Sequence, residues 1–273
     1  MLTLKPITDL VFQLSGRDLS IYERSFLQRT IGKQMEANDL PDLNTYCEFI
    51  KNSPGRMQEL ADSLNVDYSE FFRNPVTFAL LEQVILPDFL NRKLSAKNKN
   101  IRIWSAGCAG GQEPYSIAMI LGELITKSKT PVTFQIFATD TVEKSLKTAK
   151  RGSFSPHSLK NVPLHFLDRY VTLSGGFYSV VPDLKKHIEF SQYDLLDPER
   201  KSPPSGIYGD FDMVFCCNVL FYYAPEARKV ILEKLVGSLS RRGLLVTGEV
   251  EREIIQKTEL TLMEYPSSVF RRG

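Results

Sequence analysis

Short β-rich apolar runs alternate with segments of helical periodicity over the last two thirds of the chain, and no other feature constrains the fold as strongly. The apolar runs lie at 101–104, 133–138, 187–193, 211–217 and 244–247. Between them, apolar residues recur at helical spacing, as in the segment opened by Pro114 that carries Ile117, Ile120, Leu121 and Leu124. Strands that alternate with helices build a parallel sheet covered on both faces. We therefore predict an α/β fold with a doubly wound, Rossmann-like sheet.

Residues 1–95 have a different texture and predict an all-helical domain with a linker. Leu27, Ile31 and Met35 lie on one helical face, and Arg29 and Lys33 lie on the opposite face. Asn74-Pro75 is typical of a helix start, and Pro87 should end or kink that helix. The polar run 95–100 suggests a boundary, so we expect a helical domain over 1–95 and a sheet domain over 96–273.

Residues 153–187 interrupt the alternation of strands and helices. Ser174-Gly-Gly176 lies between two short β-rich runs, which predicts a small β-ribbon inserted at about 165–187. The tail from Glu259 to Arg272 resembles a hairpin across Pro266-Ser267.

Composition excludes several classes of protein. A 42% apolar and 24% charged chain is ordinary for a globular protein, and a net charge of +2 gives no reason to expect nucleic acid or an anionic membrane as the main partner. We find no apolar stretch long enough to span a membrane and no signal peptide, and we expect a cytoplasmic, monomeric protein. The four cysteines and three histidines lack ligand spacing, so we predict reduced core thiols and no metal site.

Polar residues follow four of the predicted strands, at the ends where doubly wound sheets bind ligands. Each has a functional and a structural interpretation. Asp140 could accept both hydroxyls of a ribose, or stabilise the next helix N-terminus. Asp194 could bind an adenine amine or shape a turn, and Asn218 could bind a ligand or brace a turn. The glycine-rich segment 107–111 could admit a ligand close to the backbone, or be only a tight turn.

Taken together, these strand ends outline an adenosine pocket with one additional acid, Glu113, and one additional amide, Asn218. The acid fits a cationic group better than a pyrophosphate. S-adenosylmethionine (SAM) carries an adenine, a ribose, an amino acid and a sulfonium, and it suits such a pocket.

The residues at these positions resemble the CheR family, the chemotaxis-receptor glutamate O-methyltransferases of bacteria. The resemblance rests on SEFFR at 69–73, IWSAGCAGGQEPYS at 103–116, FATD at 137–140, AKRG at 149–152, FDMVFCCNV at 211–219 and Tyr222. It implies transfer of a methyl group from SAM to receptor glutamates, giving methyl esters and S-adenosylhomocysteine (SAH), with the cytoplasmic domain of chemoreceptors as partner.

The resemblance also implies residue roles. Arg73 and Tyr222 are expected at the methyl-transfer centre, Arg73 beside both the methionine end of SAM and the acceptor carboxylate. Arg29 and Lys33 are expected to dock the acidic substrate, although a solvated face is as good an explanation. The expected cofactor-binding residues are Asp67, Ser69, Arg73, Gly107, Glu113, Asp140, Asp194, Leu195, Asn218 and Val219.

Two departures from the family pattern leave alternatives open. Cys217 stands where the family has arginine, and Gly248-Glu-Val-Glu251 differs from the family's usual sequence. The ribbon tip is also short for docking a receptor tail peptide. A degenerate SAM-binding regulatory module, or a methyltransferase for another carboxylate, therefore remains a competing interpretation.

Overall fold

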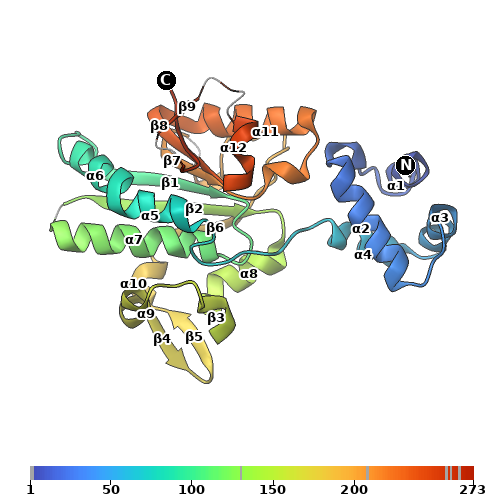
Figure 1. Ribbon diagram of the computed structural model, residues 1–273, viewed down its shortest axis with the longest axis horizontal. Coiled ribbons are helices and arrows are strands. Elements are labelled where there is room, and N and C mark those ends of the chain that lie inside the picture. Colours follow the sequence, from blue (N-terminus) through green and yellow to red (C-terminus); the bar gives the residue numbers. More distant parts are fainter. Residues whose placement is uncertain (1–2, 130, 207–208, 256–257, 259, 264–265) are drawn as a thin grey trace. The chain divides into compact units, whose positions relative to one another are not determined.

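The computed structural model describes residues 3–129, 131–206, 209–255, 258, 260–263 and 266–273. The chain forms two compact units, each of which is described by itself (Figure 1). The helical unit comprises Met1–Val66 and Leu220–Val230, and the sheet unit comprises Asp67–Val219 and Ile231–Gly273.

The helical unit buries one face of each of its main helices. They are α1 (Lys5–Ser15), α2 (Arg24–Ala37), α3 (Leu43–Lys51) and α4 (Pro54–Ser63), with a short turn η1 (Leu19–Ile21). Leu27 and Ile31 of α2 are buried in this core and Met35 packs against it, as the spacing predicts. Arg29 and Lys33 are exposed on the opposite face.

Residues 220–230 also belong to the helical unit, although the sequence places them within the second domain. The turn η5 (Leu220–Tyr222) and the first part of α11 (Pro225–Ser238) make this segment. The Tyr222 and Phe26 ring centroids are 4.9 Å apart, and the Arg228 guanidinium lies 3.2 Å from the Glu23 carboxylate. These long-range contacts carry no local sequence signal.

The sheet unit is built on seven strands in the order β6-β2-β1-β7-β8-β10-β9. The first five in that order are parallel, and β10 runs antiparallel to β8 and β9. From β1 the chain winds outward to β6 and then returns to β7 on the other side of β1, which confirms the doubly wound topology. The strands are β1 (Asn100–Ala106), β2 (Thr133–Asp140), β6 (Ile188–Gln192), β7 (Phe211–Cys216), β8 (Leu239–Thr247), β9 (Thr261–Leu262) and β10 (Val269–Arg271).

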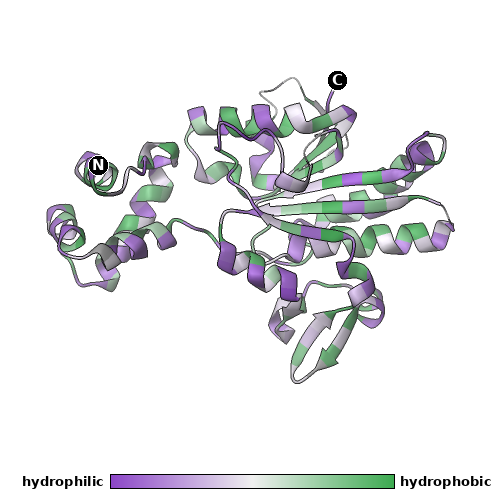
Figure 2. Ribbon diagram, turned by 180° about the vertical axis from the view of Figure 1, so that it is seen from behind, coloured by the Kyte–Doolittle hydropathy of each residue, from purple (hydrophilic) through white to green (hydrophobic). Residues whose placement is uncertain are grey.

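Two helices pack against one side of the sheet. Helices α7 (Gln112–Ser128) and α8 (Glu143–Arg151) pack along β2 and β6, on the same side of the sheet in Figure 1. Figure 2 shows hydrophobic residues interspersed with hydrophilic ones along the strands, whereas α8 is largely hydrophilic and buries only Ser145, Leu146 and Ala149. The remaining short elements are η4 (Pro204–Gly206), η6 (Glu249–Glu251) and α12 (Arg252–Ile255).

Residues 75–94 lie in the sheet unit, so the expected boundary near residue 95 differs from the division at Val66 and Asp67. The helix over α5 (Pro75–Leu80) continues through a π-helical turn at Leu81–Ile85 into α6 (Leu86–Leu94). Pro87 therefore does not end the helix. A π-helical turn of five residues precedes Pro87. Because proline has no backbone N–H to donate, the hydrogen-bonding pattern changes here and the helix continues. Phe78, Leu81, Ile85 and Phe89 belong to the core of the sheet unit.

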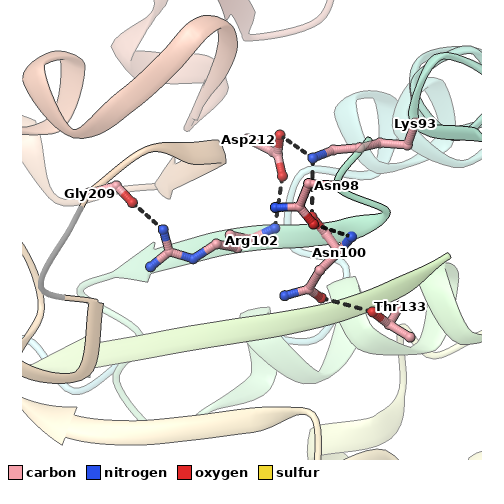
Figure 3. Close-up of polar contacts among 7 residues, drawn as sticks. All are labelled: Lys93, Asn98, Asn100, Arg102, Thr133, Gly209 and Asp212. Atoms are coloured by element: carbon pink, nitrogen blue, oxygen red, sulfur yellow. Dashed lines mark hydrogen bonds and ion pairs between the residues drawn. The ribbon is translucent and has the colours of Figure 1, made fainter. Parts of the chain in front are cut away.

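Polar contacts fix α6 to the start of the central strands (Figure 3). The Lys93 ammonium lies 2.8 Å from the Asp212 carboxylate and donates to the Asn100 carbonyl at 3.1 Å. Asp212 also accepts the Arg102 N–H at 2.9 Å, and the Arg102 guanidinium donates to the Gly209 carbonyl. Lys93 and Asp212 are 14% and 13% exposed, so this ion pair is shielded from solvent. The ion pair attaches α6, which the sequence places in the helical domain and its linker, to the sheet.

The inserted ribbon forms a separate sheet of three strands, in the order β3-β5-β4. The predicted pair, β4 (Val171–Ser174) and β5 (Phe177–Val180), is joined by β3 (Ser153–Phe154). The turn η3 (Pro156–Leu159) and the helices α9 (Leu164–Tyr170) and α10 (Pro182–Lys185) flank it. The third strand is too short to be recognised from the sequence.

Candidate cofactor site at the carboxyl ends of the strands

Asp140, the last residue of β2, connects two loops at this end of the sheet. Its Oδ2 accepts the backbone N–H of Ala109 at 2.8 Å, and its Oδ1 accepts that of Val142 at 2.9 Å. Burial raises the pKa of this carboxyl, and the nearby charge of Asp67 acts in the same direction. The bond to Val142 fits the structural interpretation, and the bond to Ala109 braces the glycine-rich loop. Each oxygen retains a lone pair, so the side chain can still accept a hydroxyl.

Glu113 lies in the first turn of α7, and its carboxylate faces β1 and β7. The Ser105 hydroxyl donates to its Oε1 at 2.7 Å, and the Cys217 thiol donates a further hydrogen bond. Burial raises the pKa of Glu113 to about 7, opposed by these two hydrogen bonds and by the positive charge of Arg73. A carboxylate that has lost its hydration in this way favours a cationic ligand group.

The glycine-rich loop owes its conformation to packing within the protein. A Cβ on Gly107, whose φ is +75°, would lie 2.7 Å from Cγ2 of Val219. A Cβ on Gly111, whose φ is +91°, would lie 2.8 Å from the Ala149 Cβ. These glycines thus allow the loop after β1 to meet the loop after β7 and the end of α8.

Asn218, in the loop after β7, has a buried polar atom that calls for a ligand. Its φ is 62°, in the left-handed region that asparagine tolerates better than most residues. Its Oδ1 is buried and has no hydrogen-bond partner among the residues that the structure describes. An unpaired buried acceptor is costly, and a ligand hydroxyl or amine would satisfy it. The residues present therefore fit an adenosine-type cofactor.

Arg73 follows Phe72, which is anchored within the sheet unit. The Phe72 N–H donates to the Ser116 hydroxyl of α7 at 3.1 Å, and its ring stacks on Phe166 at 5.4 Å. Phe72 has a φ of 51°, a strained conformation for an aromatic residue that its surroundings enforce. The Arg73 guanidinium lies 5.2 Å from the Tyr68 ring centroid and 3.4 Å from its carbonyl oxygen. Within the described ranges, Arg73 makes no ion pair with a carboxylate.

The remaining predicted site residues make fewer contacts that bear on cofactor binding. Asp194 Oδ1 accepts the Leu196 N–H at 2.8 Å, as a turn residue does, and Leu195 is buried. Ser69 is partly buried, and Asp67 is exposed but close enough to Asp140 to raise its pKa. Tyr222, Arg29 and Lys33 belong to the helical unit.

Sequence reasoning missed Glu251, which is completely buried in η6. Its carboxylate accepts the backbone N–H groups of Asn218 and Val219, both at 2.8 Å. The sequence offered one signal for this residue: an acid three positions after Gly248, shortly after the apolar strand β8.

The described part of the chain contains no group of three or more histidine, cysteine, aspartate or glutamate side chains placed to hold a metal ion. None of its helices combines the length and apolar character that crossing a membrane requires.

Comparison with known proteins identifies the family. A family model described as the SAM binding domain of CheR methyltransferase matches residues 67–269, and one described as the CheR all-alpha domain matches 3–64. A chemotaxis protein methyltransferase of Borreliella burgdorferi is 30% identical over 251 residues, which cover 91% of this chain and 87% of that protein.

Two further relatives are similar to this chain, and one of them is much longer. Chemotaxis protein methyltransferase 1 of Pseudomonas aeruginosa is 31% identical over 226 residues, covering 81% of this chain and 79% of that protein. An uncharacterized 104.1 kDa protein of Rhodobacter capsulatus is 30% identical over 88% of this chain, which spans only 24% of that protein. With a SAM-binding fold, a fitting cluster at the strand ends and two matching family models, the chain belongs to the CheR methyltransferase family and is a SAM-dependent methyltransferase.

Proposed function

We propose that this protein transfers methyl groups from SAM to glutamate side chains in the cytoplasmic domain of chemotaxis-type receptors. The observation that carries the proposal is Arg73: a guanidinium on a strained, well-anchored segment, in the electric field of Glu113 and without a carboxylate partner in the described ranges. A guanidinium matches a carboxylate with two parallel hydrogen bonds. Arg73 therefore suits an incoming glutamate.

We assign the cofactor to the cluster at the strand ends. Asp140 would accept the ribose hydroxyls, Asn218 would satisfy its free Oδ1 on the cofactor, and Glu113 would hold the ammonium of the methionine end. Gly107 and Val219 would form a wall of the cofactor site. We also assign Asp67, Ser69, Asp194 and Leu195 to this site. SAM, when bound, supplies a methyl group already activated by a sulfonium.

The protein then has to position the acceptor. A glutamate carboxylate is ionised at neutral pH, since its pKa is about 4.3, so no general base is required. Holding an oxygen about 3 Å from the methyl carbon, in line with the leaving sulfur, is the main contribution of the enzyme. Arg73 would orient that oxygen, and we propose that Tyr222 contributes to the same step.

We also propose that the exposed pair Arg29 and Lys33 on α2 recognises an acidic segment of the substrate. Exposed charges contribute little individually, typically under about 1 kcal/mol. Reversing both charges should therefore lower kcat/KM for a receptor fragment only at low salt. An unchanged value at low salt would assign these residues to a merely solvated face.

A transfer assay with radiolabelled SAM and receptor fragments tests the proposal. Alkali releases methanol from a glutamate methyl ester but leaves N-methyl groups intact, so volatile label after base treatment identifies the ester. Stable label would exclude carboxylate chemistry. Volatile label on small carboxylic acids or other proteins, with none on receptor fragments, would identify a different carboxylate as the substrate.

A further inference from the structure

Glu251 is a buried carboxylate that no part of the proposed mechanism uses. It is 0% exposed and ends the turn η6, immediately after β8. Its Oε2 accepts the backbone N–H groups of Asn218 and Gly248, and its Oε1 accepts that of Val219, all at 2.8 Å. Three charge-assisted hydrogen bonds repay the desolvation of a buried charge far better than one would.

These bonds determine the shape of the loop after β7. Two consecutive amides, of Asn218 and Val219, point at one carboxylate, and this requires a sharp change of chain direction at Asn218. The left-handed φ of 62° at Asn218 provides it, at a conformational cost that the carboxylate offsets. Val219 is thereby placed against Gly107, where it leaves no room for a Cβ.

The same turn aims the Asn218 side chain. A Cβ on Gly248 would lie 2.7 Å from the Asn218 Nδ2, so the absence of a side chain at Gly248 makes room for this amide. Glu251 holds Gly248 through its N–H and Asn218 through its N–H. The result is an Asn218 side chain whose Oδ1 is buried and unpaired within the described part of the chain.

We propose that Glu251 is a positioning residue for the cofactor: it holds the Asn218–Val219 turn in its binding conformation before SAM arrives. This rests on the assignment of Asn218 and Val219 to the cofactor site, and not on the identity of the methyl acceptor. The residue touches neither cofactor nor substrate in this scheme. It acts through two backbone amides.

The decisive variant is Glu251→Gln, which keeps the shape but has one acceptor oxygen instead of two. With the amide oxygen toward Asn218 and Gly248, an NH₂ group would face the Val219 N–H. We expect the Kd of SAH, measured by calorimetry on the full chain, to rise about ten- to a hundredfold, by analogy with the loss seen when a residue that orients a metal ligand is replaced.

Two controls separate positioning from stability. Asp212→Asn weakens another carboxylate that anchors a backbone amide of the sheet unit, at the other end of β7. It should lower Tm and leave the Kd unchanged. Glu253→Gln, an exposed residue of the next helix, should change neither. If Asp212→Asn raised the Kd as much as Glu251→Gln does, general loosening would explain the effect and the proposal would be overturned.

Asn218→Ala tests the assignment on which the proposal rests. A raised Kd for this variant with an unchanged Kd for Glu251→Gln would overturn the positioning role and leave the cofactor site intact. An unchanged Kd for Asn218→Ala would refute the assignment of this loop, and the proposal with it. None of these outcomes depends on whether glutamate is the methyl acceptor.

A measurement on the unaltered protein covers the case in which Glu251→Gln does not fold. Amide hydrogen exchange without cofactor should show protection at both Asn218 and Val219, since their N–H groups are already bonded to Glu251. Rapid exchange that slows only when SAH is added would mean that the cofactor itself forms the turn, and would overturn the proposal.

Discussion

Glu113 should make cofactor binding depend on pH, and the dependence can be worked out from its surroundings. Burial raises its pKa to about 7, so the free enzyme is a mixture of protonated and ionised forms near neutrality. If the ammonium group of SAH binds only the ionised form of Glu113, the affinity for SAH is proportional to the fraction of Glu113 that is ionised. That fraction is about 0.1 at pH 6.0 and about 0.8 at pH 7.5, so we expect about eightfold tighter binding at the higher pH.

The sign follows from the direction of the shift. Because the free carboxyl is protonated more readily than an ordinary glutamate, a cationic ligand must displace a proton at low pH, and affinity rises with pH until Glu113 is ionised. Calorimetry of SAH binding in buffers of different ionisation enthalpy measures both the Kd and the proton released.

Glu113→Gln should remove the pH dependence and weaken binding at pH 7.5 about tenfold, which corresponds to about 1.4 kcal/mol for replacing a charged by a neutral acceptor. Asp140 remains in this variant, so its own raised pKa cannot account for the loss of the slope. Glu123→Gln is the matched control. It lies on the same helix, paired with Arg169 at 2.7 Å, and should keep the slope of the unaltered protein. Affinity independent of pH in the unaltered protein, or an unchanged slope in Glu113→Gln, would refute the reasoning.

Four further outcomes are expected. Arg73→Lys should lower turnover about a hundredfold with little change in Tm, because charge is kept and the two-pronged geometry is lost; a large fall in Tm with activity retained would make Arg73 structural. Asp140→Ala should weaken the binding free energy of SAH by about 1.5–3 kcal/mol, and an unchanged Kd in calorimetry would contradict this. Cys217→Ala removes a hydrogen bond that lowers the pKa of Glu113, so the midpoint of the pH profile should move upward. Lys93→Met leaves the largely buried Asp212 without its ion-pair partner. It should lower the free energy of unfolding, measured by urea titration, by about 3–5 kcal/mol and leave the Kd of SAH, measured by calorimetry, unchanged.

The fold class was readable from the sequence because the periodicities of strands and helices are local properties of the chain. The strand ends were readable for the same reason: parallel strands end at one edge of a sheet, and Asp140 ends β2 while Asn218 follows β7. The spacing of Leu27 and Ile31 likewise indicated which face of α2 is buried.

Tertiary structure decided what depends on partners distant in sequence. Residues 75–94 look like the end of a helical domain, yet their apolar face joins the sheet core and Lys93 pairs with Asp212, more than a hundred residues away. Residues 220–230 follow a strand but pack on Phe26 and Glu23. Glu251 is an ordinary acid in the sequence, and it acquires a role only because the fold brings three backbone N–H groups to its carboxylate. Periodicity records which face of a segment is buried, whereas the partner that buries it is a property of the whole fold.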